Sequence, residues 1–122
     1  MPKKVLIVED NDLNLRLFND LLAAEGYDTV TSTGEGDIAG LAARTRPDLI
    51  LMDIRHGGGD GLETTRRIKS GASTGSIPVI AVTACAAAGD EDLARATGCV
   101  DYLMKPVSLA GLLRSVRDNL HG

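Results

Sequence analysis

The chain has 122 residues and a formal net charge of −4, with 43% hydrophobic and 25% charged residues, values that suit one globular domain with its own core. No apolar run approaches the ~18 residues of a membrane span. The apolar run near the N-terminus stops at Glu9 without a cleavage site of small residues, which excludes a signal peptide and favours a cytoplasmic location. Basic residues are scattered and the only aromatic residues are Phe18, Tyr27 and Tyr102, so nucleic-acid binding is not expected.

Four short apolar segments predict buried strands, and one more polar segment predicts an edge strand. The buried segments are rich in β-branched residues and mostly lack alternation, as is typical of parallel strands with both faces covered. In chain order, the strands are expected over residues 5–8, 27–32 (the edge strand), 49–52, 79–82 and 100–104.

Helical patterns lie between these strands. Between Leu13 and Glu25, leucines recur every four residues, with Asn11 or Asp12 available to cap the start and Gly26 to end the helix. Apolar periodicity indicates four further helices, around Ile38–Ala42, Leu62–Ile68, Leu93–Ala94 and Leu109–Leu120, the last capped by Ser108. Strict alternation of strand and helix predicts a single α/β domain, a three-layer, doubly wound, five-stranded parallel sheet with right-handed crossovers.

Charged and polar residues stand at the ends of the predicted strands. The first strand is followed by Glu9 and Asp10, the third by Asp53, the fourth by Thr83 and the fifth by Lys105. Ligands of such sheets bind beyond the carboxyl ends of the strands, so these side chains are expected to meet at one edge. Each residue alone has an ordinary explanation as a helix cap or surface residue, and only their combination indicates a site.

The chemistry of this set favours phosphoryl transfer. Three carboxylates held close together repel one another unless a cation joins them, and Mg²⁺ binds carboxylates together with phosphate oxygens and water. Asp53 is the candidate nucleophile, because a carboxylate can attack phosphorus to give an aspartyl phosphate. Lys105 offers a positive charge and Thr83 a hydroxyl group to the phosphate.

Four segments at these strands, "VLIVEDN", "DLILMDI", "IPVIAVTA" and "DYLMKP", resemble those of response-regulator receiver domains of two-component signalling. The opening stretch is similar to that of DivK-type single-domain receivers of cell-cycle control. The resemblance covers the whole chain and implies a flavodoxin-like (βα)5 fold with strand order 2-1-3-4-5.

The resemblance also implies roles for individual residues. Asp53 would accept a phosphoryl group from a phosphohistidine of a histidine kinase or histidine phosphotransferase, and Thr83 and Lys105 would contact the phosphoryl oxygens. Mg²⁺ would be held by Glu9, Asp10, Asp53 and the backbone carbonyl of Arg55.

Further implications concern the output of the domain. Tyr102 matches the aromatic switch position that follows movement of the threonine, although a half-buried strand aromatic is the plain alternative. The Lys105–Pro106 peptide bond would be cis. A receiver without an output domain would act on partner proteins through its fourth helix, fifth strand and fifth helix, as a monomer or a weak phosphorylation-dependent dimer.

The loop after Asp53 departs from the family pattern. It carries His56, Gly57, Gly58 and Gly59 where apolar residues and a proline are usual. Because glycines leave the backbone free, we expect this loop to be mobile without ligand, to order when Mg²⁺ or phosphate binds, and to weaken metal affinity.

Three other interpretations fit the sequence less well. The segment "GEGDIAG" (34–40) suggests nucleotide binding, but its spacing is GxGxxxG and it follows the second strand. A hydrolase using Asp53 as nucleophile lacks sequence for a lid that excludes water, and a pseudo-receiver used only for binding would not need the intact acidic set.

Cys85 and Cys99 have no metal-ligand spacing and are expected to be reduced residues in or near the core.

Overall fold

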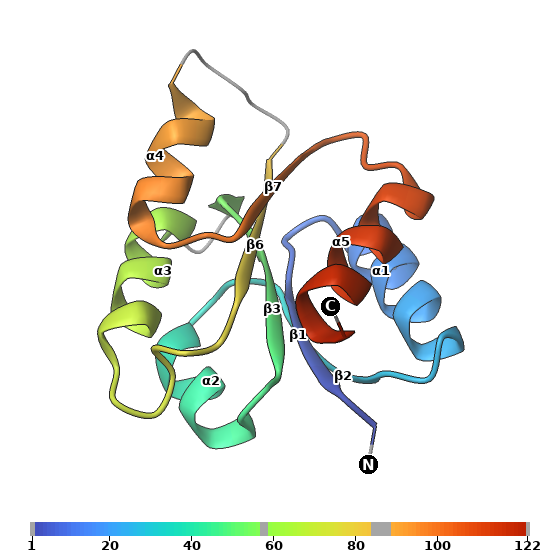
Figure 1. Ribbon diagram of the computed structural model, residues 1–122, viewed down its shortest axis with the longest axis horizontal. Helices are drawn as coiled ribbons and strands as arrows, with labels where there is room; N and C mark the ends of the chain where they lie inside the picture. The colour runs from blue at the N-terminus through green and yellow to red at the C-terminus, as the bar shows by residue number, and fades with distance from the viewer. Residues whose placement is uncertain (1, 57–58, 84–88, 122) are drawn as a thin grey trace.

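Five parallel strands form the central sheet of the protein, in the order β2-β1-β3-β6-β7 (Figure 1). The computed structural model describes residues 2–56, 59–83 and 89–121. The strands are β1 (Lys4–Val8), β2 (Asp28–Ser32), β3 (Leu49–Asp53), β6 (Val79–Thr83) and β7 (Asp101–Met104). Taken as the five strands of the sheet, this is the predicted order 2-1-3-4-5, and β2 lies at an edge as expected.

Helices cover both faces of the sheet, α1 and α5 on one side and α2, α3 and α4 on the other (Figure 1). Their bounds are α1 (Asp12–Ala24), α2 (Ile38–Thr45), α3 (Gly61–Ser70), α4 (Asp90–Thr97) and α5 (Leu109–His121). The predicted three-layer, doubly wound architecture is therefore confirmed. None of the helices in the described ranges has the length and apolar composition that a membrane span requires.

The two-sided cover explains why the strand sequences are apolar at almost every position. In β1, Val5 and Ile7 pack with α1 and α5, whereas Leu6 and Val8 pack with the helices on the opposite face. All four side chains are buried, and each contributes about 1.5–3 kcal/mol to the free energy of folding through loss of contact with water.

Local hydrogen bonds fix where the helices begin. The side chain of Asn11 accepts a hydrogen bond from the backbone N–H of Asn14 at 3.0 Å, so Asn11 rather than Asp12 caps α1. Ser108 caps α5 through a 3.2 Å hydrogen bond from the N–H of Gly111, and Asp37 caps α2. Gly34 and Gly36 have φ values of 97° and 81°. The first two glycines of "GEGDIAG" are thus accounted for by the turn that leads into the capped helix α2, and the third, Gly40, lies within that helix.

The segment after β3 differs from the expected loop. Residues Arg55–His56 (β4) and Gly59–Asp60 (β5) pair as a short antiparallel hairpin, with Arg55 opposite Asp60 and His56 opposite Gly59. Gly57 and Gly58 lie outside the described residues, so the predicted mobility of this segment stays a prediction. Of the two cysteines, Cys99 is buried as expected, and Cys85 lies outside the described residues.

Candidate functional site

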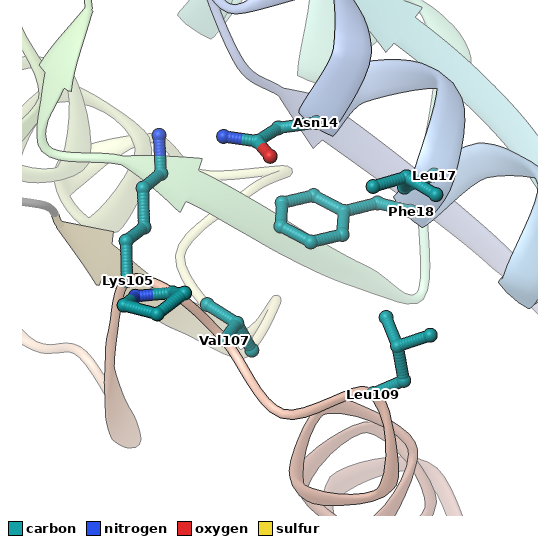
Figure 2. Close-up of a pocket in the computed structure, with 7 residues that line it drawn as sticks. Asn14, Leu17, Phe18, Lys105, Val107 and Leu109 are labelled. Atoms are coloured by element: carbon teal, nitrogen blue, oxygen red, sulfur yellow. The ribbon is translucent and has the colours of Figure 1, made fainter.

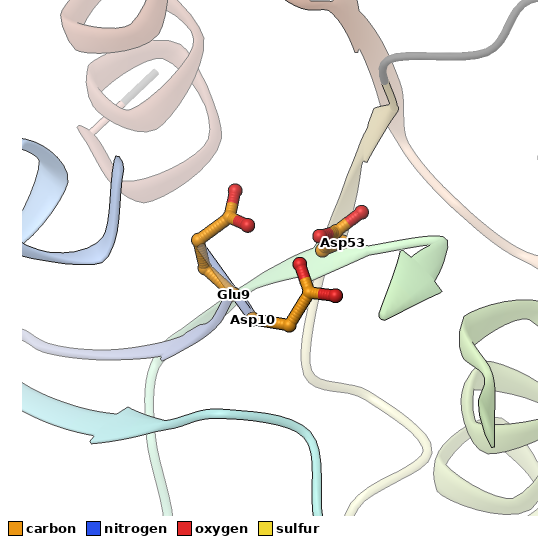
Figure 3. Close-up of side chains that lie close together, drawn as sticks. All are labelled: Glu9, Asp10 and Asp53. Carbon is orange, nitrogen blue, oxygen red and sulfur yellow. The ribbon is translucent and has the colours of Figure 1, made fainter. Parts of the chain in front are cut away.

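Three carboxylates meet at the carboxyl edge of the sheet. Glu9 and Asp10 follow β1, and Asp53 is the last residue of β3. Each offers a carboxylate oxygen, and these oxygens all lie within 4.8 Å of one another (Figure 3). Glu9 and Asp53 are only 1% and 2% exposed, whereas Asp10 is exposed. The site therefore has two buried acids, Glu9 and Asp53, and one acid, Asp10, that is exposed to solvent.

Lys105 supplies positive charge to this cluster. Its Nζ lies 2.6 Å from Oε1 of Glu9 and 3.3 Å from Oδ2 of Asp53. One ammonium group thus faces two buried carboxylates, and the exposed carboxylate of Asp10 belongs to the same cluster. The other carboxylate oxygen of Glu9, Oε2, accepts a 3.1 Å hydrogen bond from the N–H of Asn11.

This crowding changes the acidity of the central aspartate. The pKa of Asp53 is raised from 3.8 to about 7, chiefly by burial and also by the hydrogen bond and the negative charge of Glu9, while Lys105 opposes the increase only in part. Burial disfavours the charged form of Lys105, but its pKa is raised because Glu9 and Asp53 hydrogen-bond to the ammonium group and attract it. Near neutral pH, neutral and ionised Asp53 are thus present in comparable amounts.

A close backbone contact holds Asp53 in place. The N–H of Gly61, the first residue of α3, donates a 2.7 Å hydrogen bond to the carbonyl of Ile54. A Cβ atom at Gly61 would lie 2.6 Å from both the Asp53 carbonyl oxygen and the Ile54 Cα. Only glycine fits here without displacing the end of β3 that carries Asp53.

The remaining predicted residues lie along the same edge or close to it. Thr83 ends β6, is buried, and its carbonyl accepts a 2.8 Å hydrogen bond from the N–H of Lys105. Tyr102 is half-buried in the adjacent strand β7 and packs against the core beneath α2–α4. Arg55 begins β4, two residues beyond Asp53. The peptide bond between Lys105 and Pro106 is cis.

The acidic cluster fits a small divalent cation. All its donors are carboxylate oxygens, which Mg²⁺ prefers. Burial and the neighbouring Glu9 keep the pKa of Asp53 raised although Lys105 opposes the increase. A second cation next to the three carboxylates would favour the ionised form of Asp53.

Two features of the site were not anticipated from the sequence. The first is the short pairing of Lys105 with Glu9, because a lysine at a strand end gives no sign of how deeply its ammonium group reaches. The second is Asn14, which lines a pocket together with Lys105. Its only signal in the sequence is its place in the first turn of the predicted helix that directly follows Glu9 and Asp10.

Comparison with known proteins defines the class of the molecule. Residues 5–117 match the model of the response regulator receiver domain, so the chain belongs to this family of two-component signalling proteins. Among particular relatives, the polar-differentiation response regulator DivK of Brucella anthropi is 46% identical over 120 residues, which cover 98% of each chain. DivK of Brucella ovis is 44% identical with the same coverage.

Solved structures agree with this assignment. The receiver domain of sensor histidine kinase PA1611 from Pseudomonas aeruginosa, with a magnesium ion coordinated in its active site cleft, is 34% identical with a TM-score of 0.88 over the whole of both chains. A response regulator from Chloroflexus aurantiacus is 24% identical with a TM-score of 0.92, also over both whole chains, and supports the fold alone.

Proposed function

We propose that Asp53 accepts a phosphoryl group from a phosphohistidine on a histidine kinase or histidine phosphotransferase, and that its phosphorylation regulates partner proteins in a phosphorelay or cell-cycle pathway. The observation that carries this proposal is the buried Asp53 carboxylate, placed between two further acids and the Lys105 ammonium group at the sheet edge. Family membership and the likeness to DivK support it.

Mg²⁺ is the proposed cofactor. The side chains of Glu9, Asp10 and Asp53 and the backbone carbonyl of Arg55 would hold the ion, and when bound it would neutralise negative charge on the transferring phosphoryl group. The 4.8 Å grouping of the three carboxylates supports this assignment, as does the magnesium ion in the PA1611 receiver domain.

The residues of the chain would each perform a defined part of the transfer. The ionised oxygen of Asp53 forms the new O–P bond as the P–N bond of the donor breaks, and the bonding electron pair leaves with the imidazole. Lys105, now 3.3 Å from Asp53, would exchange part of this contact for a phosphoryl oxygen. The hydroxyl group of Thr83 would donate a hydrogen bond to another phosphoryl oxygen.

Phosphorylation would change the surface through which the protein binds its partners. Movement of Thr83 towards the phosphoryl group would be followed by Tyr102, shifting an existing equilibrium between two conformations. The face formed by α4, β7 and α5 would then bind the partner, and Leu93, Val100 and Met104 support this because they are 41–55% exposed there. On this proposal the protein signals rather than turns over substrate, and it is a monomer or a weak phosphorylation-dependent dimer.

Phosphorylation of intact protein tests the proposal. The experiment compares the wild type with Asp53→Asn and with the control Asp28→Asn, whose aspartate is exposed at the edge of the sheet. Each protein would be incubated with Mg²⁺ and either a small phosphodonor or a phosphorylated histidine phosphotransferase. Its intact mass would then be measured by mass spectrometry. We expect one added phosphoryl group in the wild type and the control and none in Asp53→Asn. An unlabelled wild type would contradict the proposal and favour a pure binding module. Steady hydrolysis of a phosphomonoester would favour a hydrolase instead.

A further inference from the structure

A pocket opens directly beside the proposed phosphorylation site. It has a volume of about 390 Å³ and lies between α1 and the segment that follows β7 (Figure 2). Its apolar lining comes from Leu17 and Phe18 on one side and from Val107 and Leu109 on the other. Lys105 also lines it, and the same side chain reaches Asp53 at 3.3 Å. One residue therefore connects the pocket to the phosphoryl acceptor.

Asn14 is the other polar side chain that lines this pocket among the described residues. It is half-buried on the first turn of α1, where its backbone N–H is bound by the Asn11 cap. Within the described part of the chain, its carboxamide forms no hydrogen bond. Figure 2 shows the carboxamide nitrogen on the side of the Lys105 ammonium group and the oxygen on the side of the Phe18 ring. The carboxamide is therefore available to a molecule that enters the pocket.

We propose that Asn14 is a specificity-determining residue that recognises the imidazole leaving group of the phosphoryl donor. This inference rests on the proposed function of Asp53, because it concerns the group that departs as Asp53 is phosphorylated. A phosphoryl group between Asp53 and its donor lies beside Lys105, so the leaving group lies at the mouth of the pocket that Lys105 and Asn14 share. The apolar walls suit the carbon edges of a flat ring.

The chemistry of the leaving group explains why a carboxamide is useful here. In an N-phosphorylated imidazole, the P–N bond breaks and its electron pair returns to the ring nitrogen. A proton carried by the other ring nitrogen lets the ring leave as neutral imidazole rather than as an anion. The Asn14 carboxamide oxygen accepts a hydrogen bond from this N–H and so stabilises the protonated donor, which is the form that transfers its phosphoryl group. The carboxylate leaving group of acetyl phosphate has no such N–H.

Two small phosphodonors separate these leaving groups without a partner protein. Phosphorylation by monophosphoimidazole and by acetyl phosphate would be followed with Mg²⁺ for wild type, Asn14→Ala and Asn14→Leu, the last of which keeps side-chain volume. The control is Asn19→Ala, the same change on the same helix but at a residue that contacts Thr29 instead of the pocket. Circular dichroism and Mg²⁺ titration of each variant would establish that fold and metal binding are retained.

The informative quantity is the ratio of the two rate constants, monophosphoimidazole over acetyl phosphate. We expect this ratio to fall about tenfold in both Asn14 variants, the effect of losing one hydrogen bond to a charged group, and to keep its wild-type value in Asn19→Ala. An unchanged ratio in the Asn14 variants, whether the two rates stay constant or fall together, would overturn the inference while leaving the proposed function intact. A wild type that neither donor labels would overturn both.

Discussion

Replacing Asp53 with asparagine tests the electrostatic crowding at the sheet edge without reference to any partner. Asparagine has nearly the same shape but carries no charge at any pH. Folding places the wild-type carboxylate in a site where its pKa is about 7 instead of 3.8. Between these two values the folded state binds more protons than the unfolded state, so the free energy of unfolding of the wild type must fall as the pH rises.

The size of the effect follows from the two pKa values. Linkage gives Asp53→Asn an advantage in free energy of unfolding of about 2 kcal/mol at about pH 5.5 and about 4 kcal/mol at about pH 8.5. The pH-dependent part, about 2 kcal/mol, corresponds to a difference of roughly 1 M in the urea midpoint for a protein of this size.

Urea unfolding in the presence of EDTA at the two pH values measures this difference. Subtracting the free energy of unfolding of the variant from that of the wild type removes the contribution of other titrating groups. The control Asp28→Asn, at an exposed position, should show the same pH dependence as the wild type. We expect Mg²⁺ to stabilise the wild type more than Asp53→Asn, because the ion binds the ionised carboxylate. If the difference in free energy of unfolding between the wild type and Asp53→Asn were the same at low and high pH, the electrostatic reasoning would be refuted.

Three further predictions concern the site and its backbone. Gly61→Ala should lower the free energy of unfolding by about 1–3 kcal/mol through overpacking, because its Cβ would lie 2.6 Å from the Asp53 carbonyl oxygen. The control is Gly111→Ala, where the nearest atom is 3.6 Å away. Urea unfolding measures the stability of both variants. Lys105→Met should lower Mg²⁺-free stability by about 3 kcal/mol, because two buried carboxylates lose their partner, and slow labelling by a phosphodonor at least about tenfold. Since the pKa of Asp53 is about 7, Mg²⁺ affinity should fall up to about tenfold per pH unit below that value. Titration calorimetry in buffers of different ionisation enthalpy should also show that Mg²⁺ binding releases protons.

Each of these predictions has a contrary outcome. Equal stability of Gly61→Ala and Gly111→Ala would mean that α3 moves away from Asp53 without cost. A stable Lys105→Met variant that labels at the wild-type rate would remove the ammonium group from the proposed mechanism. A Mg²⁺ affinity that does not change between about pH 5.5 and 8 would mean that the ion does not depend on ionised Asp53.

The sheet and the position of its site could be predicted because their signals are local. Apolar runs such as residues 49–52, buried on both faces, alternate with helical periodicity, and that alternation leads to a parallel sheet. Parallel strands then bring their carboxyl ends to one edge, which is why Glu9 and Asp53 meet although they are far apart in the chain. The order of the strands came from the family resemblance, because periodicity does not state which strands are neighbours.

Other features depend on contacts that no local pattern encodes. The hairpin of Arg55–His56 and Gly59–Asp60 has strands of two residues, too short for any periodicity, and glycine contributes no side chain to an alternating pattern. The 2.6 Å contact of Lys105 with Glu9 depends on how deeply two long side chains reach into the site. The need for glycine at position 61 arises from the approach of α3 to β3, which only the folded backbone reveals.

Mapping the phosphoryl group to a residue tests the central claim most directly. Wild-type protein would be phosphorylated by a phosphohistidine donor with Mg²⁺ or with EDTA, treated with borohydride to convert an aspartyl phosphate into homoserine, digested and sequenced by mass spectrometry. We predict homoserine at position 53 alone, and only when Mg²⁺ is present. Modification of another residue, or equal modification of Asp53 in EDTA, would contradict a site in which crowded carboxylates need a divalent ion to receive the phosphoryl group.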